Sequence, residues 1–240
     1  MQVIVIHGVY MNIRSILTSD GQPVTFKNFL FWFLGIVCCD LGVALCTKAG
    51  FGLSMIGAGP YILHLFAVKT LPWFSQGTAE YFWEGFLLII MCLTVKRFRV
   101  RYLLTFACAV VTGFVIDGWL AILGGSGQYT ALITRIFAFT FGTVICSFGV
   151  SCFFRTTLPL QVYELFVTEF SDKYGKQKEK VKFVFDIILL FVAIAMALLL
   201  NHDFKGIGIG TFIITFANAP IIALCGKMLD RLEGRTASGD

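Results

Sequence analysis

Charge is scarce in this chain of 240 residues, of which only 14% are Asp, Glu, Lys or Arg whereas 58% are hydrophobic. A soluble domain needs a charged surface to stay dispersed, so this composition excludes one. The mean hydropathy of +0.84 agrees with that exclusion. We therefore expect an all-α, polytopic membrane protein whose main partner is the lipid bilayer.

Motifs for metal, redox and nucleotide chemistry are also missing. The eight cysteines form no CxxC pair and do not cluster with the three histidines, so we interpret them as buried free thiols. The chain contains no nucleotide-binding signature. We therefore expect no cofactor, no metal, no nucleic-acid partner and no enzymatic activity.

Long apolar runs are what the chain has instead. Six runs come close to the ~20 residues that cross ~30 Å of hydrocarbon as a helix. They are residues 29–46, 78–95, 102–123, 131–154, 183–200 and 207–225. Two shorter stretches, 53–68 and 158–170, contain prolines and ionisable residues and are expected not to cross. The sequence thus predicts a helix bundle of six spanning helices plus two short helices, either re-entrant or interfacial. For 158–170 we favour the interface, because Glu164 and Glu169 would be costly inside lipid.

A similar pattern occurs twice, about a hundred residues apart. Residues 35–53 align with residues 142–160 at a constant offset of 107, and six of the nineteen positions are identical. The match predicts one membrane domain, 28–225, made of repeat one (28–123) and repeat two (131–225). Each repeat would hold three spans, an odd number, so the second copy would be inverted relative to the first. Segments 1–27 and 226–240 would be a cytoplasmic N-terminal segment and a cytoplasmic tail.

Basic residues orient the predicted spans, because Lys and Arg accumulate on the cytoplasmic side. With the N-terminus inside, fifteen of the nineteen basic residues fall in cytoplasmic segments. These are Arg14, Lys27, Lys96, Arg97, Arg99, Arg101, Arg155, Lys173, Lys176, Lys178, Lys180, Lys182, Lys227, Arg231 and Arg235. We therefore expect both termini in the cytoplasm.

Several ionisable residues fall within the apolar runs, where a charge costs a few kcal/mol. Asp40 and Asp117 lie deepest, and we interpret both as lining a transport cavity. Glu84 and Asp186 either couple a proton or cation or stay hydrated near the interfaces beside a basic residue. Asn218, close to Pro220, either lines a site or satisfies the carbonyl that the proline frees.

The repeat places Lys48 and Arg155 at equivalent positions on opposite sides of the membrane. Each comes just before a bend that could begin a half-helix, and a helix N-terminus attracts anions. One hypothesis is that these two cations alternately meet a small anionic solute. The other is that each anchors to lipid headgroups at the end of a span.

Several segments resemble a known family. They are residues 42–45 leading into 48–54, residues 154–156 with 163–166, Lys182 with Asp186, and residues 206–211. Together they are similar to the YczE/YyaS/YitT-like family of uncharacterised bacterial integral membrane proteins, over about residues 28–228. The resemblance implies a bacterial plasma-membrane location. It implies no defined substrate and no catalytic residues.

Two functions remain at this point. The leading hypothesis is a secondary transporter or permease for a small solute, with its site near the midplane where the repeats meet. The alternative is an accessory or regulatory membrane protein that transports nothing and binds a partner through the basic loop 173–182. The sequence leaves the oligomeric state open, with a homo-oligomer as one option.

Overall fold

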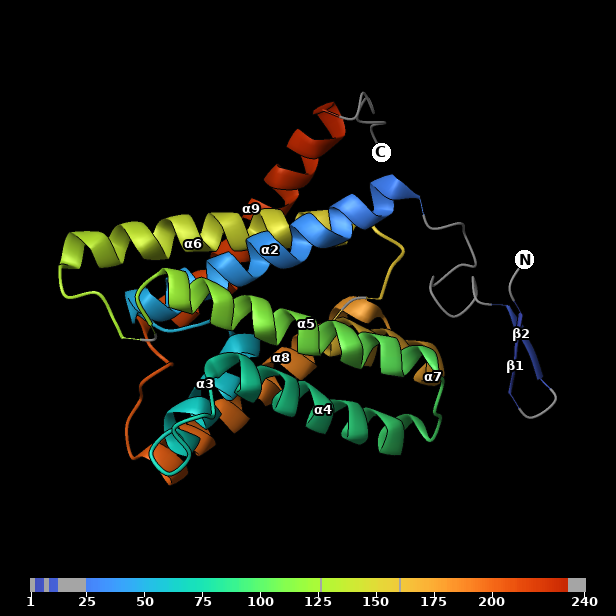
Figure 1. Cartoon of the computed structure of the whole chain (residues 1–240), viewed down its shortest axis with the longest axis horizontal. Coiled ribbons are helices and arrows are strands. Elements are labelled where there is room, and N and C mark those ends of the chain that lie inside the picture. The colour runs from blue at the N-terminus through green and yellow to red at the C-terminus, as the bar shows by residue number, and fades with distance from the viewer. Residues whose placement is uncertain (1–2, 7–8, 13–24, 126, 160, 233–240) are drawn as a thin grey trace.

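The computed structural model describes residues 3–6, 9–12, 25–125, 127–159 and 161–232. In these ranges the chain forms eight α-helices, one short π-helix and one antiparallel pair of strands. The strands, β1 (Val3–Ile6) and β2 (Val9–Asn12), precede the helices and were not predicted. All other secondary-structure elements of the described chain are helices, as expected (Figure 1).

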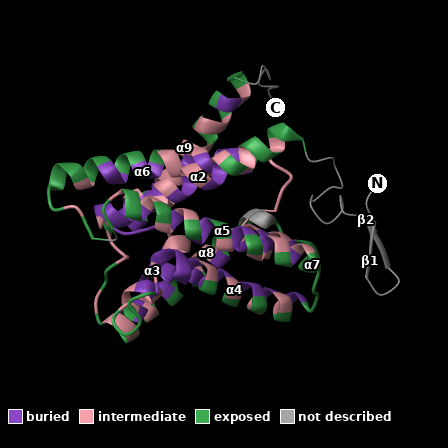
Figure 2. Ribbon diagram, viewed as in Figure 1, coloured by how far each residue is buried: buried purple, intermediate pink, exposed green. Residues whose placement is uncertain are grey.

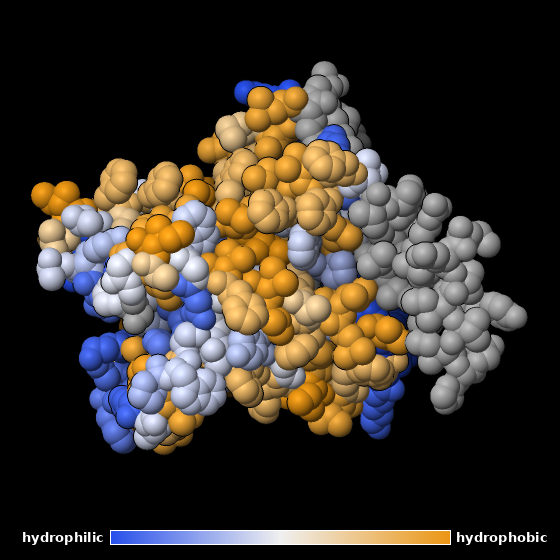
Figure 3. Space-filling model, in the orientation of Figure 1, coloured by the Kyte–Doolittle hydropathy of each residue, from blue (hydrophilic) through white to orange (hydrophobic). Residues whose placement is uncertain are grey.

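Six helices are long and apolar enough to cross a membrane, which confirms the predicted number of spans. They are α2 (Phe26–Ala49), α4 (Gln76–Val95), α5 (Arg101–Ile122), α6 (Leu132–Phe153), α8 (Lys178–Met196) with its π-helical extension η1 (Ala197–Asn201), and α9 (Ile209–Leu232). Their outer faces expose large apolar side chains such as Phe86, Leu93 and Phe137. Figure 3 shows apolar residues over much of the visible face, a surface suited to lipid rather than water.

Helices α2 and α6 cross in antiparallel orientation (Figure 1). A Cβ on Gly42 would lie 2.5 Å from the carbonyl oxygen of Gly142, and a Cβ on Gly149 would lie 2.8 Å from that of Gly35. The crossing therefore depends on residues without side chains, which let two backbones approach closely. Figure 2 shows burial concentrated where the helices meet, whereas the projecting end of α9 is more exposed.

Two short helices of 13 residues each, α3 (Met55–Ala67) and α7 (Val162–Tyr174), begin inside the bundle. The Val162 N–H donates to Glu84, halfway along α4, and the Tyr174 hydroxyl donates to the carbonyl of Thr94, near the end of α4. Helix α7 therefore runs alongside half of a spanning helix. The interfacial position that we favoured for 158–170 is wrong, because a helix lying among headgroups would not follow a span in this way.

Helix α3 has the same relation to the second half of α8. Its Ala58 packs against Ala193, and the carbonyl of Ile62 accepts a hydrogen bond of 3.0 Å from Asn201, at the end of η1. Both short helices thus have the geometry of re-entrant half-helices, which is tolerated where the irregular backbone is buried in protein or lines a cavity.

Helix α2 begins on the side of the bundle where α6 and α9 end (Figure 1). The Asn28 side chain donates to the Thr157 hydroxyl, just beyond α6. The Arg155 guanidinium in turn donates to the carbonyl of Gly226 at 2.6 Å and pairs with Asp230 in α9. The three helix ends are therefore held together on one side.

Candidate solute cavity

A cavity of about 170 Å³ lies between α2, α6, α9 and the beginnings of α3 and α7. Most of its wall is apolar, as in typical small-molecule sites. The polar groups that line it are Asp40, Ser54, Glu80, Thr143, Gln161, Glu164, Lys182 and Asn218. Three carboxylates and one ammonium group therefore line one cavity.

The chain enters the cavity through a glycine bend after α2. Gly50 and Gly52 have φ angles of +66° and +110°, a region that side chains rarely adopt. A Cβ on Gly52 would also lie 2.5 Å from the Thr211 hydroxyl. The bend returns the chain into the bundle, where the Ser54 hydroxyl accepts the Gly57 N–H and caps α3.

The second entry follows α6. There the Trp32 indole donates to the carbonyl of Pro159 at 3.1 Å and ties the loop to α2. Gln161 is the N-cap residue of α7 and lines the cavity, as Ser54 does for α3. The positive ends of two helix dipoles thus meet the same space.

Carboxylates on α2 and α4 form one wall of this region. Asp40 is 1% exposed, and its Oδ2 has no hydrogen-bond partner among the described residues. Glu80 accepts a hydrogen bond of 3.4 Å from the Tyr163 hydroxyl. Glu84, one helical turn further, is fully buried and accepts the Val162 N–H with one oxygen, while its other oxygen has no partner in the described part of the chain. Such buried, incompletely paired carboxylates are costly, and ionisable residues inside spans are usually functional.

The ammonium group of the cavity comes from Lys182 on α8. Lys182 lies 3.4 Å from Glu164 and 3.8 Å from Asp186, which forms an ion-pair cluster beside the start of α7. The Lys182 ammonium group is thus paired with two carboxylates. Elsewhere in the lining, Asn218 accepts a hydrogen bond of 2.7 Å from the Ser147 hydroxyl, which joins α9 to α6.

The predicted site residues divide into two groups. Asp40 and Asn218 line the cavity, Glu84 lies behind the start of α7, and Asp186 connects to the cavity through Lys182. The structure therefore brings these four residues together, and their role in binding stays a prediction.

Lys48, Asp117 and Arg155 are not among the lining residues. The Lys48 ammonium donates to the carbonyl of Gly125 at 2.9 Å, and the Arg155 guanidinium donates to that of Ser151 at 3.1 Å. The Asp117 carboxylate accepts the Gly77 N–H at 2.8 Å and the Ser75 hydroxyl. This corrects the expectation that Asp117 is a cavity residue, because its contacts cap the start of α4.

Sequence reasoning did not single out six of the polar lining residues as site residues, namely Ser54, Glu80, Thr143, Gln161, Glu164 and Lys182. For Glu80 a signal was present, because residues four apart share a helix face and Glu84 had been singled out. The facing thiols of Cys39 and Cys146, 3.6 Å apart, were expected only as packing residues. All eight cysteines are free, as expected.

Together, the helices and the buried polar cavity define a multi-pass α-helical membrane protein. The chain belongs to the family of unknown function DUF6198, whose model matches residues 26–227. It is 25% identical to the "uncharacterized protein YyaS" of Bacillus subtilis (strain 168) over 192 residues, which cover 78% of this chain and 86% of that protein. No solved structure matches. The resemblance to a YyaS-like bacterial family is thereby confirmed.

Proposed function

We propose that this protein is a secondary transporter or permease whose small solute occupies the central cavity. The observation that supports it is the convergence of two half-helix beginnings with the carboxylates of Asp40 and Glu80. Transporter sites are commonly built from interrupted helices near the bilayer midplane. Ionisable residues inside spans usually mark a solute, ion or proton pathway.

The proposal includes an inverted repeat. The repeat offset of 107 converts Gly35 into Gly142 and Gly149 into Gly42. The two close glycine contacts between α2 and α6, Gly35 with Gly149 and Gly42 with Gly142, are therefore equivalent under the repeat. Helix α2 also contacts α5 as α6 contacts α9, and α3 contacts α8 as α7 contacts α4. These exchanges support two copies related by a pseudo-two-fold axis, the arrangement that underlies alternating access.

The charge of the cavity favours a proton or small cation as the solute or the coupling ion. Asp40, Glu80 and Glu164 face it, against Lys182 alone. The earlier hypothesis of an anionic solute relied on Lys48 and Arg155, whose charged groups instead bind backbone carbonyls. In this proposal the protein is not an enzyme and lies in a bacterial plasma membrane with both termini in the cytoplasm.

Flux into proteoliposomes tests the proposal. Wild-type protein should carry protons or a small cation, followed with a pH-sensitive dye inside the vesicles and with a panel of labelled amines and metal cations. Asp40→Asn keeps the shape of the side chain and removes its charge, so flux should fall by at least about tenfold, the change that follows from losing roughly 1.4 kcal/mol of binding.

The matched control is Asp203→Asn, which alters an exposed ion pair with Lys205 in the loop before α9. This variant should keep wild-type flux. If correctly inserted wild-type protein moves no ion or solute of the panel, the transport proposal is wrong. If Asp40→Asn transports normally, the assignment of Asp40 to the solute site is wrong. In the first case the accessory-protein reading, with its basic loop 173–182, takes its place.

A further inference from the structure

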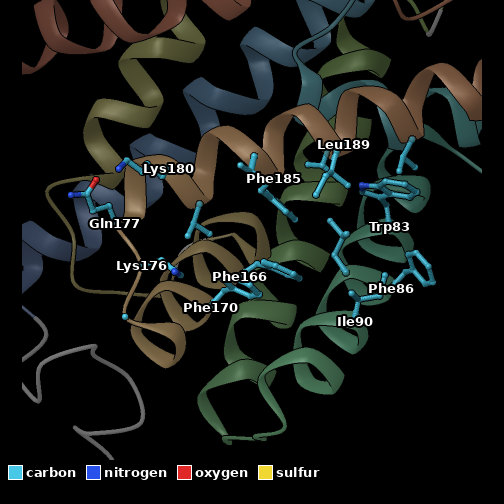
Figure 4. A pocket seen from close by; sticks show the side chains of 16 residues that line it. Trp83, Phe86, Ile90, Phe166, Phe170, Lys176, Gln177, Lys180, Phe185 and Leu189 are labelled. Carbon is cyan, nitrogen blue, oxygen red and sulfur yellow. The ribbon is translucent and has the colours of Figure 1, made fainter.

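A second and larger hollow lies on the outer surface of the bundle, away from the central cavity. This apolar groove has a volume of about 680 Å³ and runs between α4 and α8, with α7 as its floor (Figure 4). Its volume is in the range of ligand sites. Phe86, Ile188 and Val184 are more than half exposed along it, so the groove opens toward the surroundings of the helices.

The groove exists because α7 is only a half-helix. Helix α7 contacts both α4 and α8, and the space that remains between these two helices is the groove. Its floor is aromatic, since Phe166 stacks on Phe185 with 4.6 Å between ring centroids and on Phe170 with 6.3 Å. Figure 4 shows these rings below α8 and the Trp83 side chain at the far end.

One end of the groove is basic and polar. Lys176, Gln177 and Lys180 line it there, at the turn between α7 and α8. The ion pairs of the described residues include Lys182 but neither Lys176 nor Lys180. The groove is therefore apolar along its length and positively charged at one end only.

The length of the groove indicates what kind of molecule occupies it. From Lys180 to Val192 the groove follows thirteen residues of α8, which span roughly 18 Å at the helical rise per residue. This is close to half of the ~30 Å hydrocarbon thickness. An apolar occupant of one leaflet's depth with an anionic group at the water side is a phospholipid, whereas a helix of a second copy would continue through the other leaflet.

We propose that this groove binds one anionic phospholipid. One of its two acyl chains lies over Phe166 and Phe170 toward Trp83, and its phosphate and headgroup contact Lys176 and Lys180. By the distribution of basic residues this lipid belongs to the cytoplasmic leaflet. The inference does not depend on whether the protein transports a solute.

Quenching of Trp83 fluorescence by brominated lipids tests this site. Full-length protein is placed in phosphatidylcholine vesicles, and brominated phosphatidylglycerol or brominated phosphatidylcholine is titrated in. The difference between wild type and Trp83→Phe isolates the Trp83 signal from the other three tryptophans. Each surface lysine strengthens binding of an anionic lipid about fivefold, and the groove has two, so half-maximal quenching should need roughly twenty-five-fold less of the anionic lipid.

The double variant Lys176→Gln/Lys180→Gln should lose that preference and still be quenched by both lipids. The matched control, Lys96→Gln/Lys227→Gln, removes the same charge from exposed positions outside the groove and should keep the preference. Equal quenching by both lipids in wild type, or an unchanged preference in the Lys176/Lys180 variant, would overturn the proposal. Absence of Trp83 quenching at every lipid fraction, with a cross-linkable dimer, would assign the groove to a second copy of the chain.

Discussion

Asp40 and Asp117 both lie inside apolar helices, but the two side chains make different contacts. Asp40 lines the cavity, and one of its oxygens has no partner in the described part of the chain, whereas both oxygens of Asp117 accept hydrogen bonds from the start of α4. The sequence gives the distance of a residue from the end of its span but not the direction in which its side chain points. For that reason it predicted the position of Asp40 in the cavity and misjudged that of Asp117.

At the residue scale, Asp117→Ala should lower the stability of the protein by about 1 kcal/mol, the usual cost of losing a helix cap. It should leave the affinity for any transported ion unchanged, because Asp117 does not line the cavity. Thermal unfolding in detergent and flux in vesicles measure the two effects. Asp203→Ala, in an exposed loop pair, is the control and should melt like wild type. If Asp117→Ala kept wild-type stability and bound the ion more weakly, Asp117 would belong to the binding site.

At the element scale, the sequence predicted the spanning helices well because hydropathy and length decide them. It could not place α3 and α7, since a short apolar helix with a few polar residues is typical of both re-entrant and interfacial segments. Their positions are decided by tertiary contacts, such as Val162 against Glu84 and Ile62 against Asn201. The same limit explains why Ser54 and Gln161 were missed, because they reach the cavity only through the placement of these helices.

The crossing of α2 and α6 gives a prediction at this scale. In Gly42→Ala the added Cβ would lie 2.5 Å from the carbonyl oxygen of Gly142, so the two helices would have to separate. Overpacking of this kind typically costs about 1–3 kcal/mol. Gly118→Ala is the matched control, because a Cβ on Gly118 of α5 meets nothing within 4 Å and alanine favours a helix. Melting temperature in detergent should fall for Gly42→Ala and stay level or rise for Gly118→Ala. Equal stability of the two variants would argue against a tight crossing.

At the scale of the whole molecule, α2 begins and α9 ends on the same side of the bundle. The loop between α4 and α5 lies on that side too. That loop carries Arg97 and Arg99, so the positive-inside rule assigns this side to the cytoplasm. The loop before α9, with Asp203, would then face outward. We therefore expect Arg97→Cys to react with a membrane-impermeant maleimide only after cells are opened, and Asp203→Cys to react in intact cells. Wild type, whose native thiols lie within helices, sets the background. The reverse labelling pattern would show that the whole bundle has the opposite orientation in the membrane. The groove between α4 and α8 would then bind its lipid from the outer leaflet.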